Sequence, residues 1–228
     1  GQDLGLGSDA EGITGLITEV TIRVRPAEDE VVWGARFDTA EDLARSINAV
    51  REAGLPLWSV NFINPKMAEL KNQLPPHIEH GHTVETHRPT IPEGYVALFV
   101  APASRRQAID DRLGDLVRAA GGEFVDEEVA SHEWEDRFDL MHVKRLGPSI
   151  APAEVLVPLS SLDSALEGIR DRIRLPMVME GMVDGSRGEV TLLGFILHDE
   201  RKLTFNFAFG LALSVLKVAK ENEGRAYS

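Results

Sequence analysis

The chain contains no cysteine among its 228 residues. This excludes disulfide bonds, thiolate metal sites and cysteine nucleophiles, and it is compatible with the cytoplasmic location that we expect. A run of bilayer length is also missing, because the longest strongly apolar stretch, residues 205–216, is too short for a membrane span. No basic segment followed by an apolar one opens the sequence, so we expect no signal peptide.

Basic residues are in deficit, with 24 Lys and Arg against 37 Asp and Glu and a formal net charge of −13. Binding to a phosphate backbone needs clustered positive charge, so nucleic acid is not an expected partner. Hydrophobic residues at 43% and charged residues at 27% are ordinary for a soluble globular protein. The length fits one domain or two small ones.

Several segments carry both a start and a stop signal for a helix. In the first, Thr39 can cap a helix with Asp42 three residues later, and Gly54 ends it. Similar signals predict helices over residues 104–121 and 161–173. A last helix is predicted over residues 203–222, although residues 204–209 alternate in the manner of a strand.

Strand candidates alternate with these helices. They are residues 31–37, 57–63, 95–101, 154–159, 175–182 and 190–198. The order predicts an α+β fold, in which an antiparallel sheet carries helices packed on one face, as in ferredoxin-like repeats. Residues 74–94 contain four prolines and no periodicity, which predicts a loop or an extended arm.

The most informative stretch is residues 9–25, DAEGITGLITEVTIRVR. Gly12 and Gly15 lie three apart in a predicted loop, and Val20, Ile22 and Val24 then alternate as in a strand. Glycines at this spacing let backbone N–H groups approach a flat or anionic ligand closely, because no Cβ intervenes. Taken alone, the pattern also fits an ordinary loop that enters a strand.

This stretch resembles the sequence GSEGTLGIITE, which closes the FAD-binding half of flavoproteins similar to glycolate oxidase and D-lactate dehydrogenase. These enzymes belong to the vanillyl-alcohol oxidase / para-cresol methylhydroxylase superfamily. The resemblance implies that residues 1–26 are the end of an FAD-binding domain and that residues 27–228 are the C-terminal cap, or substrate, domain. It further implies that the intact enzyme oxidises a small 2-hydroxy acid or related alcohol.

The resemblance also implies the cofactor and the partners. FAD would be present in the intact enzyme and absent from this chain alone, whose partner would be the FAD-binding half; a homo-oligomer is compatible with it. We expect the isolated chain to be inactive. The residues expected at the flavin edge are Glu11, Gly12, Gly15, Ile17 and Thr18.

Two further signatures follow in the order that the family has them. The first is Trp134-x-x-Arg137, which predicts an Arg137 that faces the substrate carboxylate and a Trp134 that packs into the core. On residues alone, a surface arginine in an ion pair explains this motif equally well. The second is the Val-x-Val-Pro strand within residues 154–160, EVLVPLS.

Metal-dependent members of the family carry a His-x-Gly-Asp-Gly-Asn-x-His motif, whereas residues 180–188 here read EGMVDGSRG. Both histidines and the asparagine are missing, and the expected lysine before the Val-Pro strand is Pro152 or a neighbour, so we expect no metal. Glu180 and Asp184 could form a substitute pair, but a hairpin turn at Asp184-Gly185-Ser186 is the simpler interpretation.

A histidine-rich loop offers a second set of metal ligands, namely His77, His80, His82 and His87 with Glu79 and Glu85. Its spacing matches no closed-site pattern, so we interpret it as a polar loop. Two other functions remain open from the sequence: a non-catalytic α+β binding or assembly module, and a subunit that docks on a separate flavin chain.

Overall fold

The computed structural model describes residues 16, 18–22, 24, 26–75, 78–79, 82–83, 88–147 and 149–227. The strands are β1 (Glu30–Phe37), β2 (Ser59–Ile63), β3 (Ile78–Glu79), β4 (His82–Thr83), β5 (Tyr95–Pro102), β6 (Glu123–Phe124), β7 (Ser149–Pro158), β8 (Met177–Asp184), β9 (Glu189–His198) and β10 (Arg225–Ala226). The α-helices are α2 (Ala40–Glu52), α3 (Pro65–Lys71), α4 (Arg106–Ala119), α5 (Glu127–Glu135), α6 (Leu162–Arg172) and α7 (Phe205–Glu221). Short 3-10 segments lie at Ala103–Arg105, Asp136–Phe138, Leu140–Leu146 and Leu159–Ser161.

The main sheet has eight antiparallel strands in the order β10-β7-β9-β8-β2-β5-β1-β6. The first repeat has the element order β1-α2-β2-β5-α4-β6 along the chain, and its strands lie in the spatial order β6-β1-β5-β2. The second repeat, β7-α6-β8-β9-α7-β10, has the equivalent spatial order β10-β7-β9-β8. This is the ferredoxin-like β-α-β-β-α-β arrangement occurring twice. The two repeats meet where β2 pairs with β8.

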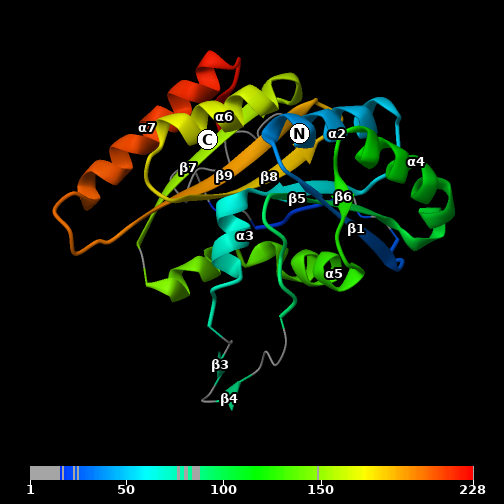
Figure 1. Ribbon diagram of the computed structural model, residues 1–228, viewed down its shortest axis with the longest axis horizontal. Helices are drawn as coiled ribbons and strands as arrows, with labels where there is room; N and C mark the ends of the chain where they lie inside the picture. Colours follow the sequence, from blue (N-terminus) through cyan, green and yellow to red (C-terminus); the bar gives the residue numbers. More distant parts are fainter. Residues whose placement is uncertain are drawn as a thin grey trace.

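Helices α2, α4, α6 and α7 cover one face of this sheet (Figure 1). The side chains between the two layers form the main core, in which Phe37, Phe62 and Phe99 from the strands meet Leu43 and Ile47 from α2. The α+β fold with helices on one face of an antiparallel sheet is therefore confirmed. Two shorter helices, α3 and α5, lie on the opposite face (Figure 1).

Most predicted elements form where expected, and local chemistry explains their ends. Thr39 caps α2 by accepting a hydrogen bond from the backbone N–H of Asp42, as predicted. Residues 204–209 do not form a strand, because α7 already begins at Phe205 and buries Ala208 on its inner face.

The N-terminal stretch departs from its predicted strand. Among its described residues, 18–22 and 24 belong to no strand, and Val20, Ile22 and Val24 are exposed. Extended backbone needs a neighbouring strand to complete a hydrogen-bonded ladder, and these described residues have none in the sheet. The proline-rich segment does form an arm, in which β3 and β4 pair as a small separate sheet (Figure 1).

The junction of the two repeats yields a testable prediction. Gly181 on β8 lies opposite Phe62 on β2, and a Cβ on Gly181 would be 2.2 Å from the Phe62 ring, which is 1% exposed. We expect Gly181→Ala to lower the free energy of unfolding by about 1–3 kcal/mol, the usual cost of overpacking a core. Urea unfolding of the two proteins measures this difference.

Gly185→Ala is the matched control, because a Cβ there would meet nothing within 4 Å. We expect it to change stability by less than about 0.5 kcal/mol. Equal urea midpoints for the two variants would contradict this prediction, because they would mean that the junction accommodates a methyl group beside the Phe62 ring without cost.

Candidate functional site

A pocket lined by both polar and apolar side chains lies on the face of the sheet opposite the four-helix layer. It is bounded by β2, β5 and β8 together with α3, α5 and the adjoining 3-10 segments, and it encloses about 30 Å³. That is room for roughly one or two water molecules, or for the polar end of a small molecule. Its polar lining consists of Asn61, Lys71, Glu133, Asp136, Arg137 and Glu180.

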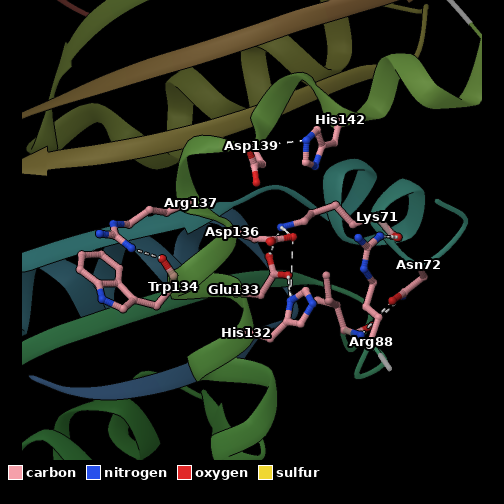
Figure 2. A network of polar contacts seen from close by, with 11 residues as sticks. Lys71, Asn72, Arg88, His132, Glu133, Trp134, Asp136, Arg137, Asp139 and His142 are labelled. Carbon is pink, nitrogen blue, oxygen red and sulfur yellow. Dashed lines mark hydrogen bonds and ion pairs between the residues drawn. The ribbon is translucent and has the colours of Figure 1, made fainter. Parts of the chain in front are cut away.

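A buried ion pair forms one wall of this pocket. Lys71, the last residue of α3, places its Nζ 2.6 Å from Oε2 of Glu133 on α5 (Figure 2). The two residues are only 8% and 4% exposed. Asp136 Oδ2 lies 3.9 Å from the same ammonium, and His132 Nδ1 lies 3.5 Å from the other Glu133 oxygen. Burial favours the neutral form of Glu133, but His132 and Lys71 outweigh it and lower its pKa.

Glu180 is the second buried carboxyl group of the pocket, and it behaves in the opposite way. It lies within β8 and is 8% exposed. Burial raises the pKa of Glu180 to about 7, although Lys71 and the Asn61 amide act to lower it. Two neighbouring glutamates therefore have pKa values shifted in opposite directions, because His132 and Lys71 outweigh burial at Glu133 whereas burial dominates at Glu180.

Two oxygen atoms of this lining are buried without a hydrogen-bond donor among the described residues. They are Oδ1 of Asn61 and Oε1 of Glu133. Leaving a buried acceptor unsatisfied costs about 1–3 kcal/mol, and such atoms are rare in folded proteins. The pocket can therefore accept a hydrogen bond from a molecule that enters it.

Arg137 lies at the edge of the same pocket, in the 3-10 segment that follows α5. Its guanidinium stacks on the Trp134 ring at 4.0 Å from the ring centroid (Figure 2). It also lies 4.5 Å from the centroid of the Phe138 ring. The Trp134 ring does not enter the core as predicted. It is half-buried, and its Nε1 donates a hydrogen bond to Glu30 at the start of β1, because its polar edge needs an acceptor.

The flavin-edge loop is not tested by the geometry. Glu11, Gly12, Gly15 and Ile17 lie outside the described residues, and Thr18 is exposed. The histidine-rich loop is likewise outside them, except for the backbones of Glu79 in β3 and His82 in β4.

Asp184 does not join Glu180 in a substitute site. Its Oδ1 accepts hydrogen bonds from the backbone N–H groups of Ser186 and Arg187 at 3.0 and 3.1 Å. This confirms the interpretation of these residues as a turn between β8 and β9.

Sequence reasoning missed the set formed by Asn61, Lys71 and Glu133. Lys71 and Glu133 are separated by 62 positions and sit on helices without strong periodicity, so no spacing rule connects them. His132, Glu133 and Asp136 are, within the described part of the chain, the one group close enough together to hold a metal ion. The Lys71 ammonium already supplies a positive charge at that position.

A larger hollow of about 660 Å³ lies beside the start of α3 and the end of α6. Its charged side chains include Lys66, Glu69 and Arg170, which are 36%, 49% and 64% exposed. Water screens charges at such positions, so selective recognition of a ligand is weaker there than in the buried pocket.

Across the described residues, helices that are both long and apolar enough to cross a membrane are absent.

The structure to be compared is thus a pair of adjoining ferredoxin-like repeats with a pocket on the face opposite the four-helix layer. The family "FAD linked oxidases, C-terminal domain" matches residues 26–210, well over half of the chain. The chain therefore belongs to this family.

Solved structures agree with this assignment at the level of the fold. Two crystal forms of an alkyldihydroxyacetonephosphate synthase, P212121 and P1, align with TM-scores of 0.61 and 0.59 at 11% and 10% identity. Each alignment covers 86% of this chain and 40% of the synthase. No curated protein matches the sequence.

The buried pair supplies the prediction for this site. We expect Lys71→Met to lower the free energy of unfolding by about 3–5 kcal/mol, because it leaves the Glu133 carboxylate buried without its counter-charge. Chemical denaturation at neutral pH measures this loss. The control is Arg45→Met, which breaks the surface pairs of Arg45 with Glu41 and Asp42; the three side chains are 49%, 69% and 24% exposed. It should cost less than about 1 kcal/mol; similar losses for both variants would contradict a special role of the buried pair.

Proposed function

We propose that this chain is the substrate-binding C-terminal half of an FAD-dependent oxidoreductase that oxidises a small 2-hydroxy acid or related alcohol. The family supports the flavin-linked class, and the matched range supports a cap domain beginning near residue 27. In this proposal, the FAD-binding half precedes the cap, and residues 1–26 are its last segment. The chain spans less than half the length of the synthases that it resembles, so the activity belongs to a larger assembly.

The observation that carries the proposal is the position of Arg137 beside a pocket with buried acceptors. Among the described residues, its guanidinium makes one hydrogen bond, to the Trp134 carbonyl oxygen. Its remaining N–H groups form the planar fork that binds a carboxylate at two points. Stacking on Trp134 and Phe138 fixes the plane of that fork. A carboxylate on Arg137 would direct the neighbouring hydroxyl of a 2-hydroxy acid towards the acceptors of the pocket.

The cofactor fits outside the pocket rather than in it. The enclosed volume is far too small for FAD. However, Phe138 and Met141 directly follow the lining residues Arg137 and Leu140 in the chain, and Met182 shares a face of β8 with Glu180. These three residues are exposed at 84%, 52% and 40%, and in this proposal they offer an apolar surface to a flavin ring. Bound FAD would supply the acceptor for the hydride. Glu11, Gly12, Gly15, Ile17 and Thr18 are the residues of this chain that we expect at its edge.

The test of substrate binding is Arg137→Lys in the complete, FAD-loaded enzyme. Loss of a bidentate charge-assisted contact costs about 2–3 kcal/mol, so kcat/KM should fall roughly 30- to 150-fold. Steady-state kinetics with a 2-hydroxy acid measures this ratio.

Arg118→Lys serves as the control for Arg137, because Arg118 is an exposed arginine whose ion partner, Asp115, lies on its own helix. It should leave kcat/KM unchanged. If Arg137→Lys also retains the wild-type value, Arg137 is a surface residue and does not bind the substrate.

The isolated chain provides a second test. If the pyrophosphate of FAD is bound by the preceding half, the 228-residue chain alone should bind FAD more weakly than micromolar. Titration followed by quenching of flavin fluorescence measures the dissociation constant. A sub-micromolar value would show that the chain holds the cofactor by itself, contrary to the proposed division of the enzyme into two halves.

A further inference from the structure

Glu180 is an unusual residue for the middle of a strand. It is the single charged residue of β8 before its last position, and it is buried. On the same row of the sheet, Glu180 pairs with Leu193 of β9, which in turn pairs with Glu154 of β7. Glu154 is exposed, so the row contains one buried and one solvated carboxyl group.

Burial of Glu180 is not offset by an ion pair within the described part of the chain. The nearest cation of the pocket, Lys71, is bonded to Glu133 instead. Burying an ionisable group without a counter-charge is costly, and folds retain such groups mainly at functional sites. The sheet itself gives no reason for the carboxyl group, because the preceding strand residues Val178 and Met179 are apolar and buried.

Asn61 provides the second observation. It lies on β2 two residues before Ile63, the partner of Glu180, so the two polar side chains are diagonal neighbours on one face. Asn61 is 7% exposed, lines the same pocket, and its Oδ1 has no donor among the described residues. An acceptor and a base therefore stand side by side in a pocket that Arg137 borders.

We propose that Glu180 is the catalytic base that takes the proton from the substrate hydroxyl, and that Asn61, its diagonal neighbour on β2, positions this carboxyl group. The inference rests on the proposed function. In the step, the O–H bond breaks and its proton goes to the Glu180 carboxylate. The carbinol C–H bond breaks with transfer of its electron pair, as hydride, to the flavin of the other half. A carbon–oxygen double bond forms, the substrate loses two electrons, and the flavin gains them.

The neighbouring carboxyl groups are less suited to this role. Glu133 is held ionised by His132 and Lys71, which makes it a weaker proton acceptor, and Asp136 lies 3.9 Å from the same ammonium. The pKa of about 7 for Glu180 matches the best range for a base that works near neutral pH. The charged groups around it are Lys71 from α3, Glu133 from α5, and Asp136 and Arg137 from the following 3-10 segment.

The first experiment measures flavin reduction in the complete FAD-loaded enzyme, by rapid mixing with a 2-hydroxy acid across pH 5–9. We expect Glu180→Gln to slow reduction by about 10²- to 10⁴-fold, the usual contribution of a general base. The wild-type rate should rise with pH through about 7, and this rise should disappear in the variant. Glu180→Asp should keep the pH-dependent rise at a reduced rate.

Glu154→Gln is the matched control, since it removes the exposed carboxyl group of the same row. It should leave both the rate and its pH dependence unchanged. Asn61→Leu should slow reduction by roughly 10-fold, the effect of one lost hydrogen bond, and should keep the rise with pH.

The second experiment measures the titration of Glu180 through protein stability and does not depend on catalysis. The folded-state pKa lies above the unfolded value of 4.5, so the stability associated with the neutral group is complete below pH 4.5 and is lost as the pH rises through 7. The urea midpoint of Glu180→Gln relative to wild type should therefore increase between pH 4.5 and 8. A difference that stays constant over this range would overturn the assignment, because a group ionised throughout is not a neutral-pH base.

The outcomes separate the two proposals. If wild type reduces its flavin and Glu180→Gln does so at the same rate with the same pH profile, the inference is wrong while the proposed function stands. If wild-type flavin is reduced by neither 2-hydroxy acids nor related alcohols, the proposed function fails and the role of Glu180 fails with it.

Discussion

The short pairing of β2 with β8 is the constraint on which the rest of this structure depends. Three residue pairs join β2 to β8, and the Phe62 ring fits there because Gly181 has no side chain. The ring is directed to the helical face, where it joins the main core. On the opposite face the same pairing brings Asn61 and Glu180 together. This pairing therefore joins the two halves of the sheet and sets the floor of the pocket.

Electrostatic pairing then gives the buried carboxyl groups of the pocket different charge states. One lysine acts on two buried glutamates, but it is bonded to Glu133 alone. Glu133 is consequently stabilised as an anion, whereas Glu180 is left in a desolvated site where its neutral form competes. Arg137 is held apart from this cluster by its contacts with Trp134 and Phe138. A carboxylate and a hydroxyl on adjacent carbons would thus meet different partners.

The fold was accessible from the sequence because its signals are local. Thr39 and Asp42 define a helix start by their own hydrogen bond, and the apolar run within residues 95–101 follows from burial against two layers. The sequence indicated the site through the Trp134-Arg137 motif and, as half of a possible substitute pair, through Glu180. Lys71 and Glu133 meet through tertiary packing of two short helices, and the shifted pKa of Glu180 arises from burial that only the folded chain creates. The strand expected around Val20 failed because alternation indicates a strand but does not supply its neighbour.

The two repeats contribute unequally to the pocket. The second repeat follows the plain ferredoxin-like path and provides Glu180 as its one polar lining residue. Helix α3 and the arm lie between β2 and β5, and α5 lies after β6, so the other charged residues come from connections that follow strands of the first repeat. Connections tolerate replacement far better than the strands that they join. A new substrate selectivity could therefore evolve, or be engineered, by exchanging these connecting segments while the eight-stranded sheet and Glu180 remain in place.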